Sequence, residues 1–219
     1  MNSDSNSHPE TKPLQSKVKI FLFIFEITLI LTLLLIWLFS KSIQSSKSLI
    51  VLFFYSFPSE FLVGLVPHEP VLLYYGKYHS PFTVALVAVT GTVLAEALNY
   101  SVFTFINSTR LFEEMRRKKI VSKIVELFNK APFTAIIIAG FTPVPFFPIR
   151  FLVVMGHYRE IKYLLAVFLS RAPRFYILAF LGDAFKIPDN ILIVLFIILI
   201  ITAYVSLVGN LRKKPWKNK

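Results

Sequence analysis

Six ionisable side chains lie inside or beside long apolar stretches of this 219-residue chain. They are three glutamates and three arginines: Glu60, Glu69, Glu96, Arg150, Arg171 and Arg174. A lone carboxylate in the middle of a bilayer costs on the order of 3 kcal/mol on insertion scales. We therefore expect these groups to face the protein interior, where opposite charges can neutralise one another.

Two roles fit this set of charges. The residues can line a polar pathway for an anionic lipid headgroup, in which arginines bind phosphate by charge-assisted hydrogen bonds and a carboxylate takes up a proton. They can also form a purely structural network of ion pairs. Under the first interpretation a lipid is the natural cargo, because its tails stay in the bilayer while its headgroup crosses.

Other kinds of site have little support in the sequence. The chain has no cysteine, and its four histidines are scattered without the spacing of metal ligands: His8, His68, His79 and His157. We therefore expect no metal site and no cofactor. Motifs of enzymes that act on lipid phosphates, such as D-x-x-D-G, are also missing. We expect the protein not to be an enzyme.

The composition indicates an all-α integral membrane protein. Hydrophobic residues make up 55% of the chain and charged residues only 16%, where a soluble domain carries about 25% charge. The mean hydropathy is +0.65. The net charge of +12 comes from basic residues that cluster between apolar blocks. Anionic lipid headgroups are therefore the expected partner, rather than nucleic acid, and a homo-oligomer is compatible with the sequence.

Four apolar runs are long enough to cross a bilayer, which takes about 20 residues. They are Ile20–Phe39, Pro81–Ile106, Ile161–Leu181 and Ile191–Val208. We therefore expect about four transmembrane helices, in a membrane domain over residues 20–209. It is flanked by a disordered cytosolic tail at residues 1–19 and a basic cytosolic tail at residues 210–219.

Two further apolar blocks, Leu49–Tyr75 and Phe133–Gly156, are broken by prolines and polar residues. Irregular backbone survives at membrane depth only when it is buried in protein or lines a wet cavity. We therefore expect each block to be a re-entrant hairpin, with an apolar arm on either side of its tip. The residues expected to shape the hairpins are Pro58, Pro67, Pro70, Gly76, Pro143, Pro145, Pro148 and Gly156.

A basic segment over residues 107–130 separates the two blocks. Its apolar residues recur near helical spacing, and a run of four cations crowds its middle: Arg116, Arg117, Lys118 and Lys119. One interpretation is an amphipathic helix that lies on an anionic leaflet. The other is an ordinary positively charged cytoplasmic loop without lipid specificity.

The distribution of lysine and arginine predicts the topology. If each hairpin returns to the side it left, most basic residues share one side with both termini, and few lie on the other: Lys41, Lys47, Lys77 and Lys186. Basic loops stay in the cytoplasm. The two hairpins then enter from opposite sides, which is the inverted repeat of many transporters. A bacterial inner membrane is the expected location, with an endomembrane as the alternative.

The charged and proline-rich blocks resemble those of the DedA/SNARE-associated Golgi protein (VTT domain) superfamily, over roughly residues 50–182. The matching motifs are Pro67-His68-Glu69 with Glu60 upstream, Gly91-x3-Ala95-Glu96 followed by Tyr100, Phe141-x-Pro143, Gly156, and Arg171 with Arg174. The chain departs from the family pattern in carrying Ala95 and Glu96 where glycine and aspartate are usual. Gly140 and Phe146 occupy positions that bacterial transporters of the family fill with arginine.

The resemblance implies lipid movement across the bilayer. Bacterial members look like transporters of a polyprenyl phosphate carrier or phospholipid, and eukaryotic members resemble scramblases. The departures at Gly140 and Phe146 weaken the case for proton-coupled transport of a polyprenyl phosphate and leave energy-independent scrambling open. A structural or assembly protein for envelope or organelle membranes is the main alternative. Two further alternatives are a membrane enzyme and a simple ion channel.

Overall fold

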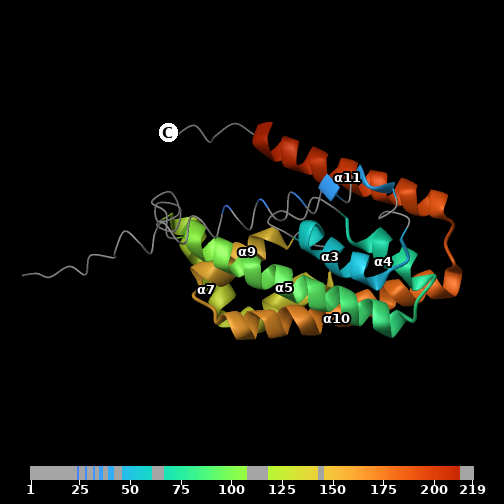
Figure 1. Ribbon diagram of the computed structural model, residues 1–219. Coiled ribbons are helices and arrows are strands. Elements are labelled where there is room, and N and C mark those ends of the chain that lie inside the picture. The colour runs from blue at the N-terminus through green and yellow to red at the C-terminus, as the bar shows by residue number, and fades with distance from the viewer. Residues whose placement is uncertain are drawn as a thin grey trace, which may run out of the picture.

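The described part of this computed structural model is entirely helical (Figure 1). The structure describes residues 24, 28, 32, 35, 36, 39–41, 46–60, 67–107, 118–142 and 146–212, with side chains up to residue 202. Eight helices are defined within these ranges: α3 (Leu49–Glu60), α4 (Glu69–Gly76), α5 (Pro81–Asn107), α7 (Lys119–Lys130), α8 (Pro132–Phe141), α9 (Phe147–Met155), α10 (Glu160–Phe185) and α11 (Asp189–Arg212).

The two long apolar helices α5 and α10 form the centre of the bundle. They pack against each other and run in opposite directions (Figure 1). α5 has 27 residues, or about 40 Å at 1.5 Å per residue, which exceeds the hydrocarbon thickness of a bilayer. Both helices have the length and composition of membrane spans, as the sequence predicts.

The structure describes the first and the last of the four predicted spans to different extents. α11 covers the predicted run Ile191–Val208 and packs on α4. The run Ile20–Phe39 lies largely outside the described residues. The positions within it that are described, such as Ile24 and Thr28, are helical.

The first proline-broken block consists of α3 and α4, and the chain returns to the end of the bundle from which it started. Residues that precede α3 touch the end of α4 and the residues that follow it. His79 Nε2 lies 2.5 Å from the Lys47 carbonyl, the Lys47 ammonium stands over the Tyr78 ring, and Tyr75 donates a hydrogen bond to the Ser46 carbonyl. Both predicted apolar arms of this block are helical, and the tip between them, residues 61–66, lies outside the described residues.

The second block consists of α8 and α9, and it returns to the opposite end in the same way. Gly156, directly after α9, packs so closely against Asn129 of α7 that a Cβ atom there would clash. Tyr100, near the end of α5, donates a hydrogen bond to the Tyr158 carbonyl. α7 meets α8 at a bend of 94°, so α7 lies across the direction of α8.

The molecule has two halves, α3 to α5 and α8 to α10, and each half packs one of its short helices on the long helix of the other. The first arm of each block packs on the long helix that follows it, α3 on α5 and α8 on α10. The second arm packs on the long helix of the other half, α4 on α10 and α9 on α5. Glycines allow the closest of these contacts, because Gly76 lies against the Ala179 backbone and Gly182 against the Leu73 backbone.

The residues expected to shape the hairpins fall at helix ends or inside an arm. Pro70 and Pro148 lie in the first turns of α4 and α9, where the missing N–H leaves no helical hydrogen bond unmade. Pro67 precedes α4, and Pro58 lies inside α3. Pro143 and Pro145 lie outside the described residues.

The basic segment is described only in part. Helix α5 runs to Asn107, and residues 108–117, with Arg116 and Arg117, lie outside the described residues. The described helix begins only at Lys119, with Lys118 as its N-cap. Over residues 119–130 the predicted amphipathic helix is present.

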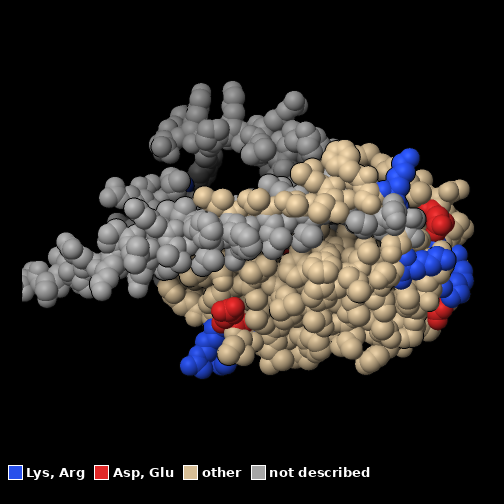
Figure 2. All heavy atoms as spheres, in the orientation of Figure 1, with Lys and Arg blue, Asp and Glu red and all other residues tan. Residues whose placement is uncertain are grey.

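Charged side chains gather at the two ends of the bundle, with an uncharged band between them on the face shown in Figure 2. The end where α5 begins and α10 ends carries Lys47, Lys77, Asp183, Lys186 and Asp189. The opposite end, with α7 and the start of α10, carries Lys118, Lys119, Lys123, Glu126, Lys130, Arg159, Glu160 and Lys162. An apolar belt between charged ends is the surface expected of a bilayer-spanning protein.

Replacing Gly76 or Gly182 by alanine should separate α4 from α10, because the added methyl group meets the backbone of Ala179 or Leu73. We expect each change to lower the free energy of unfolding by about 1–3 kcal/mol. Thermal unfolding in detergent, followed by circular dichroism, measures this loss. The control is Ala184→Val, which adds methyl groups at an exposed position of α10; equal midpoints for all variants would contradict the tight crossing.

Candidate functional site

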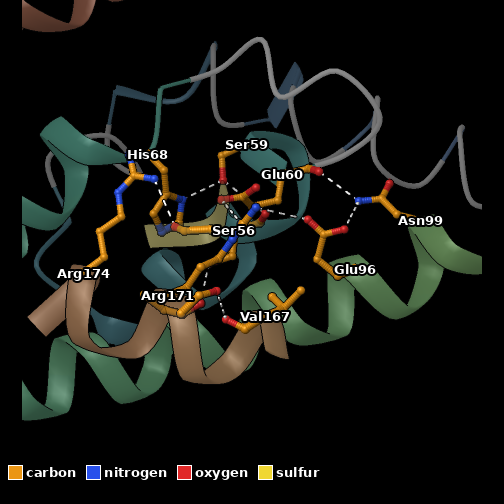
Figure 3. Close-up of polar contacts among 12 residues, drawn as sticks. Ser56, Ser59, Glu60, His68, Glu96, Asn99, Val167, Arg171 and Arg174 are labelled. Atoms are coloured by element: carbon orange, nitrogen blue, oxygen red, sulfur yellow. Dashed lines mark hydrogen bonds and ion pairs between the residues drawn. The ribbon is translucent and has the colours of Figure 1, made fainter. Parts of the chain in front are cut away.

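The buried carboxylate of Glu96, near the middle of α5, is the centre of the charged site (Figure 3). Its side chain is 0% exposed. Arg150 of α9 donates to it from two nitrogens, with Nη2 2.5 Å from Oε1 and Nε 2.9 Å from Oε2. Arg171 of α10 adds a contact of 3.3 Å to Oε1. Three helices from both halves thus converge on one carboxylate.

Glu60, at the end of α3, completes a four-membered cluster with these residues. Its Oε1 lies 2.5 Å from Arg171 Nη1 and its Oε2 lies 3.5 Å from Arg150 Nη2. Arg150 also donates to the Glu60 carbonyl, at 2.7 Å. The cluster therefore holds two carboxylates and two guanidinium groups, and its formal charge is zero.

Two polar side chains that the sequence analysis did not assign to the site complete the hydrogen bonds of Glu96. The Tyr163 hydroxyl, from α10, donates to Oε2 at 2.6 Å. Asn99, one turn along α5 from Glu96, donates to Oε2 at 3.3 Å and to the Glu60 carbonyl at 2.9 Å. The spacing of Asn99 from Glu96 places them on one helix face, which was the available signal. Nothing in the sequence singled out Tyr163.

Phe146, just before α9, is the third site residue that the sequence analysis missed as a contact. Its ring centre lies 4.6 Å from the Arg171 guanidinium carbon and 5.6 Å from that of Arg150. A ring face attracts a cation by its quadrupole. The uncharged Phe146 ring thus supports two arginines without adding charge.

Glu69 and Arg174 form a second, more accessible ion pair. Arg174 Nη2 lies 2.6 Å from Glu69 Oε1, and the two side chains are 21% and 37% exposed, respectively. Arg174 also donates to the carbonyls of Thr142 at 3.1 Å and Gly140 at 3.4 Å, at the end of α8. The pair therefore connects the start of α4 to the end of α8, across the two proline-broken blocks.

Backbone carbonyls of α3 and α8 accept hydrogen bonds from arginines of other elements. Arg150 donates to the carbonyl of Glu60, the last described residue of α3. The last carbonyls of a helix have no partner within the helix and carry partial negative charge, and Arg174 satisfies the Gly140 carbonyl at the end of α8. This explains how α8 can stop in the interior of the bundle without leaving that carbonyl unpaired.

Each of the six ionisable residues has a partner of opposite charge. Four of them face the interior as predicted, whereas Glu69 and Arg174 are partly exposed. The six residues form the four-membered cluster and the separate Glu69–Arg174 pair. Among the residues that the structure describes, no group of three His, Asp or Glu side chains is arranged to hold a metal ion. The arrangement can form and exchange ionic hydrogen bonds, and the Glu69–Arg174 pair is its more exposed part.

The expected lipid-binding surface lies on α7, at one end of the bundle (Figure 1). Lys118 and Lys119 are exposed at its start. Ile120, Ile124 and Leu127 form an exposed apolar stripe along it, whereas Val125 and Phe128 are buried. One face of α7 thus packs against the protein, and a second, apolar face is exposed.

Comparison with known proteins identifies one family. A family model described as "VTT domain" matches residues 66–184, more than half of the chain, from the start of α4 to the end of α10. Glu60 and α3 precede the matched range. No curated protein and no solved structure matches the chain.

Replacing Glu96 by glutamine should leave Arg150 and Arg171 with a single carboxylate between them. Removing one partner of a buried ion pair costs about 3–5 kcal/mol, and we expect a loss of that size in the free energy of unfolding. Thermal unfolding and size-exclusion profiles in detergent measure it. Adding Arg171→Gln should recover part of the loss, because the cluster again contains one charge of each sign.

The control for this variant is Asp183→Asn, which breaks the exposed pair of Asp183 with Lys186. Exposed pairs contribute at most about 1 kcal/mol, so its midpoint should stay near wild type. A Glu96→Gln protein as stable as Asp183→Asn would show that the cluster does not hold the bundle together.

Proposed function

Because this chain belongs to the VTT-domain family of membrane proteins (the DedA/SNARE-associated Golgi protein family), we propose that it translocates lipids between the leaflets of a bilayer. The observation that carries the proposal is the Glu69–Arg174 pair. It joins the two hairpins, carries charges of both signs and is the accessible part of an otherwise buried ionic site. A headgroup phosphate can replace Glu69 on Arg174 by the same kind of charge-assisted hydrogen bond.

We further propose that the two helix–break–helix blocks are re-entrant hairpins of an inverted repeat. Each block returns to its own end of the bundle, and the ends are opposite. The arms also exchange symmetrically between halves, α4 on α10 and α9 on α5. Transporters with inverted repeats bind their substrates near the midplane, where broken helices meet. Together with α5, α10, α11 and the run Ile20–Phe39, this gives about four spans and two hairpins.

In this proposal the six ionisable residues have two different roles. Glu60, Glu96, Arg150 and Arg171 brace the hairpin tips, because they are buried and saturated by one another. Glu69 and Arg174 exchange partners as a headgroup passes. The phospholipid or polyprenyl phosphate crosses without any covalent step, so the protein is a scramblase or flippase and not an enzyme.

One observation favours a second function. Every charge of the site is compensated within the protein, as a structural or assembly protein would require. In that case the ion pairs only hold the two halves together, and stability and biological activity should fall in parallel when they are broken.

We place both termini and α7 in the cytoplasm, most simply of a bacterial inner membrane, and propose that α7 lies on the anionic leaflet. The end of the bundle at α7 carries the larger excess of basic residues over acidic ones. The bend of 94° between α7 and α8 lets α7 lie along the surface while α8 enters the membrane. An exposed apolar stripe beside lysines is typical of interfacial helices.

A reconstituted flip assay tests the proposal. Purified protein is placed in liposomes with a trace of fluorescent lipid, and a membrane-impermeant quencher reports outer-leaflet lipid. Wild-type protein should expose inner-leaflet lipid as well. Glu69→Gln should abolish this, because no carboxylate remains to release the headgroup from Arg174. The matched control Asp183→Asn, at an exposed site on the same long helix as Arg174, should keep wild-type flipping.

Quenching limited to the outer leaflet, for several headgroups and with or without a proton gradient, would favour the structural alternative. Loss of flipping in Glu69→Gln accompanied by an equal loss of folded protein would favour it too. A Glu69→Gln protein that flips like wild type would exclude the Glu69–Arg174 pathway.

A second prediction concerns the surface of α7. Replacing Lys118 and Lys119 by serine should reduce the anionic lipid that copurifies with the protein, by about 1 kcal/mol of binding free energy per lysine. Native mass spectrometry of the purified protein measures bound lipid. The control Lys186→Ser, at the other end of the bundle, should leave it unchanged. Equal lipid retention in both variants would leave α7 without a lipid-specific role.

A further inference from the structure

His68 is a buried histidine between the two ionic parts of the site. It is the N-cap of α4 and only 5% exposed. Its ring stacks on Phe175, with ring centres 4.9 Å apart. In Figure 3 the ring lies between Ser59 and the guanidinium group of Arg174. The bracing cluster and the Glu69–Arg174 pair do not use this residue.

Ser59 lies beside the His68 ring and is coupled to its tautomer. Ser59 Oγ lies 3.1 Å from the Ser56 carbonyl and 2.7 Å from His68 Nδ1. When its one hydrogen goes to the carbonyl, Oγ accepts from Nδ1 and the ring carries its hydrogen there; when it goes to Nδ1, the ring hydrogen is on Nε2. The other ring nitrogen, Nε2, is buried and has no hydrogen-bond partner among the described residues. In the first of these tautomers Nε2 is a bare lone pair, which is the position at which a histidine binds a second proton.

The charged and titratable groups around His68 come from every element packed on it. They are Tyr55 and Glu60 on α3, Glu69 on α4, and Arg171 and Arg174 on α10. An imidazolium there would require an anionic acceptor for its Nε2 hydrogen. Glu60 is already held by Arg171 and Arg150. Glu69 has a single ion pair and is 37% exposed, so it is the carboxylate that can change partner.

We propose that His68 and Arg174 bind a phosphate group together with one proton. The inference rests on the proposed function, in which Arg174 is the headgroup contact. A proton from water binds His68 Nε2 and draws Glu69 away from Arg174, and the phosphate takes the place of Glu69. The site has zero formal charge before binding, and a proton plus a phosphate monoanion leave it at zero.

Electroneutrality defines the chemical class of the ligand. Burying a net charge in a medium of low dielectric is strongly unfavourable, so one proton matches one negative charge. A phosphodiester carries that charge, in a lipid headgroup such as phosphatidylglycerol. Inorganic phosphate shares the chemistry but lacks the apolar tails that hold a lipid at the site. A zwitterionic lipid needs no accompanying proton.

Calorimetry in detergent tests the inference without any transport step. Short-chain phosphatidylglycerol is titrated into the purified protein near pH 7.5, in buffers that differ in ionisation enthalpy. The dependence of the heat on the buffer gives the protons taken up on binding. We expect wild-type protein to take up about one proton per lipid, and its affinity to fall by about tenfold per pH unit as the pH rises. Short-chain phosphatidylcholine should bind without proton uptake, and inorganic phosphate alone should bind more weakly than phosphatidylglycerol.

The decisive variant is His68→Asn, because its amide nitrogen can keep the hydrogen bond to Ser59 but cannot be protonated. It should bind phosphatidylglycerol more weakly, without proton uptake and independently of pH. The control is His157→Asn, at an exposed turn of the second hairpin with φ of 53°, a conformation that asparagine tolerates. It should behave as wild type. Proton uptake that is absent in wild type, or unchanged in His68→Asn, would overturn the inference.

A second measurement does not depend on the folding of any variant. Nitrogen-15 spectra of wild-type protein should show His68 protonated at Nδ1 alone without lipid, and at both nitrogens with phosphatidylglycerol. A ring protonated at Nε2 alone would overturn the inference. Flipping in liposomes without proton uptake would also overturn it and leave the proposed function intact. Proton-linked binding without flipping would support the inference and overturn the proposed function.

Discussion

The rest of the structure depends on the carboxylate of Glu96 in the middle of α5. An unpaired charge at this depth would be expelled or neutralised, so cations must come to it from elsewhere in the chain. Arg150 reaches it from the first turns of α9, and Arg171 reaches it from the middle of α10. Because Arg150 also donates to the Glu60 carbonyl of α3, the same residue connects α9 to both α3 and α5. One buried charge thus explains why α3, α5, α9 and α10 converge where they do.

The packing of a short helix of each half on the long helix of the other half restricts how the molecule can move. α4 packs tightly on α10 through the glycine contacts of Gly76 and Gly182, and Arg150 of α9 binds Glu96 of α5. Sliding one half past the other would break both. The Glu69–Arg174 pair is different, because it joins the two proline-broken blocks through partly exposed side chains. Rearrangement at this pair is therefore the least costly local change at the site, and it does not require the bracing cluster to open.

Much of the site could be predicted from the sequence, because charges inside apolar stretches are rare and must find partners. The same reasoning predicted the two blocks that return to their own ends, since prolines at a broken apolar run rarely suit a straight span. Tyr163 and Phe146 could not be found in this way. Tyrosine and phenylalanine are common in membrane helices, and the hydrogen bond from Tyr163 to Glu96 spans 67 positions of sequence. The amphipathic helix predicted within residues 107–130 is described from Lys119 to Lys130, and over residues 108–117 it stays a prediction.

The neutrality of the site bears on how tightly a lipid can bind. A translocation site must hold a headgroup well enough to admit it and weakly enough to release it. Phe146 gives Arg150 and Arg171 a ring face instead of a further cation, and Gly140 packs closely on Ser170, which leaves no room for a long side chain. A surplus of arginine would trap a phosphate, whereas matched charges let Glu69 compete for Arg174. Under the proposed function, weak and reversible headgroup binding follows from this balance and favours exchange between leaflets over storage of one lipid.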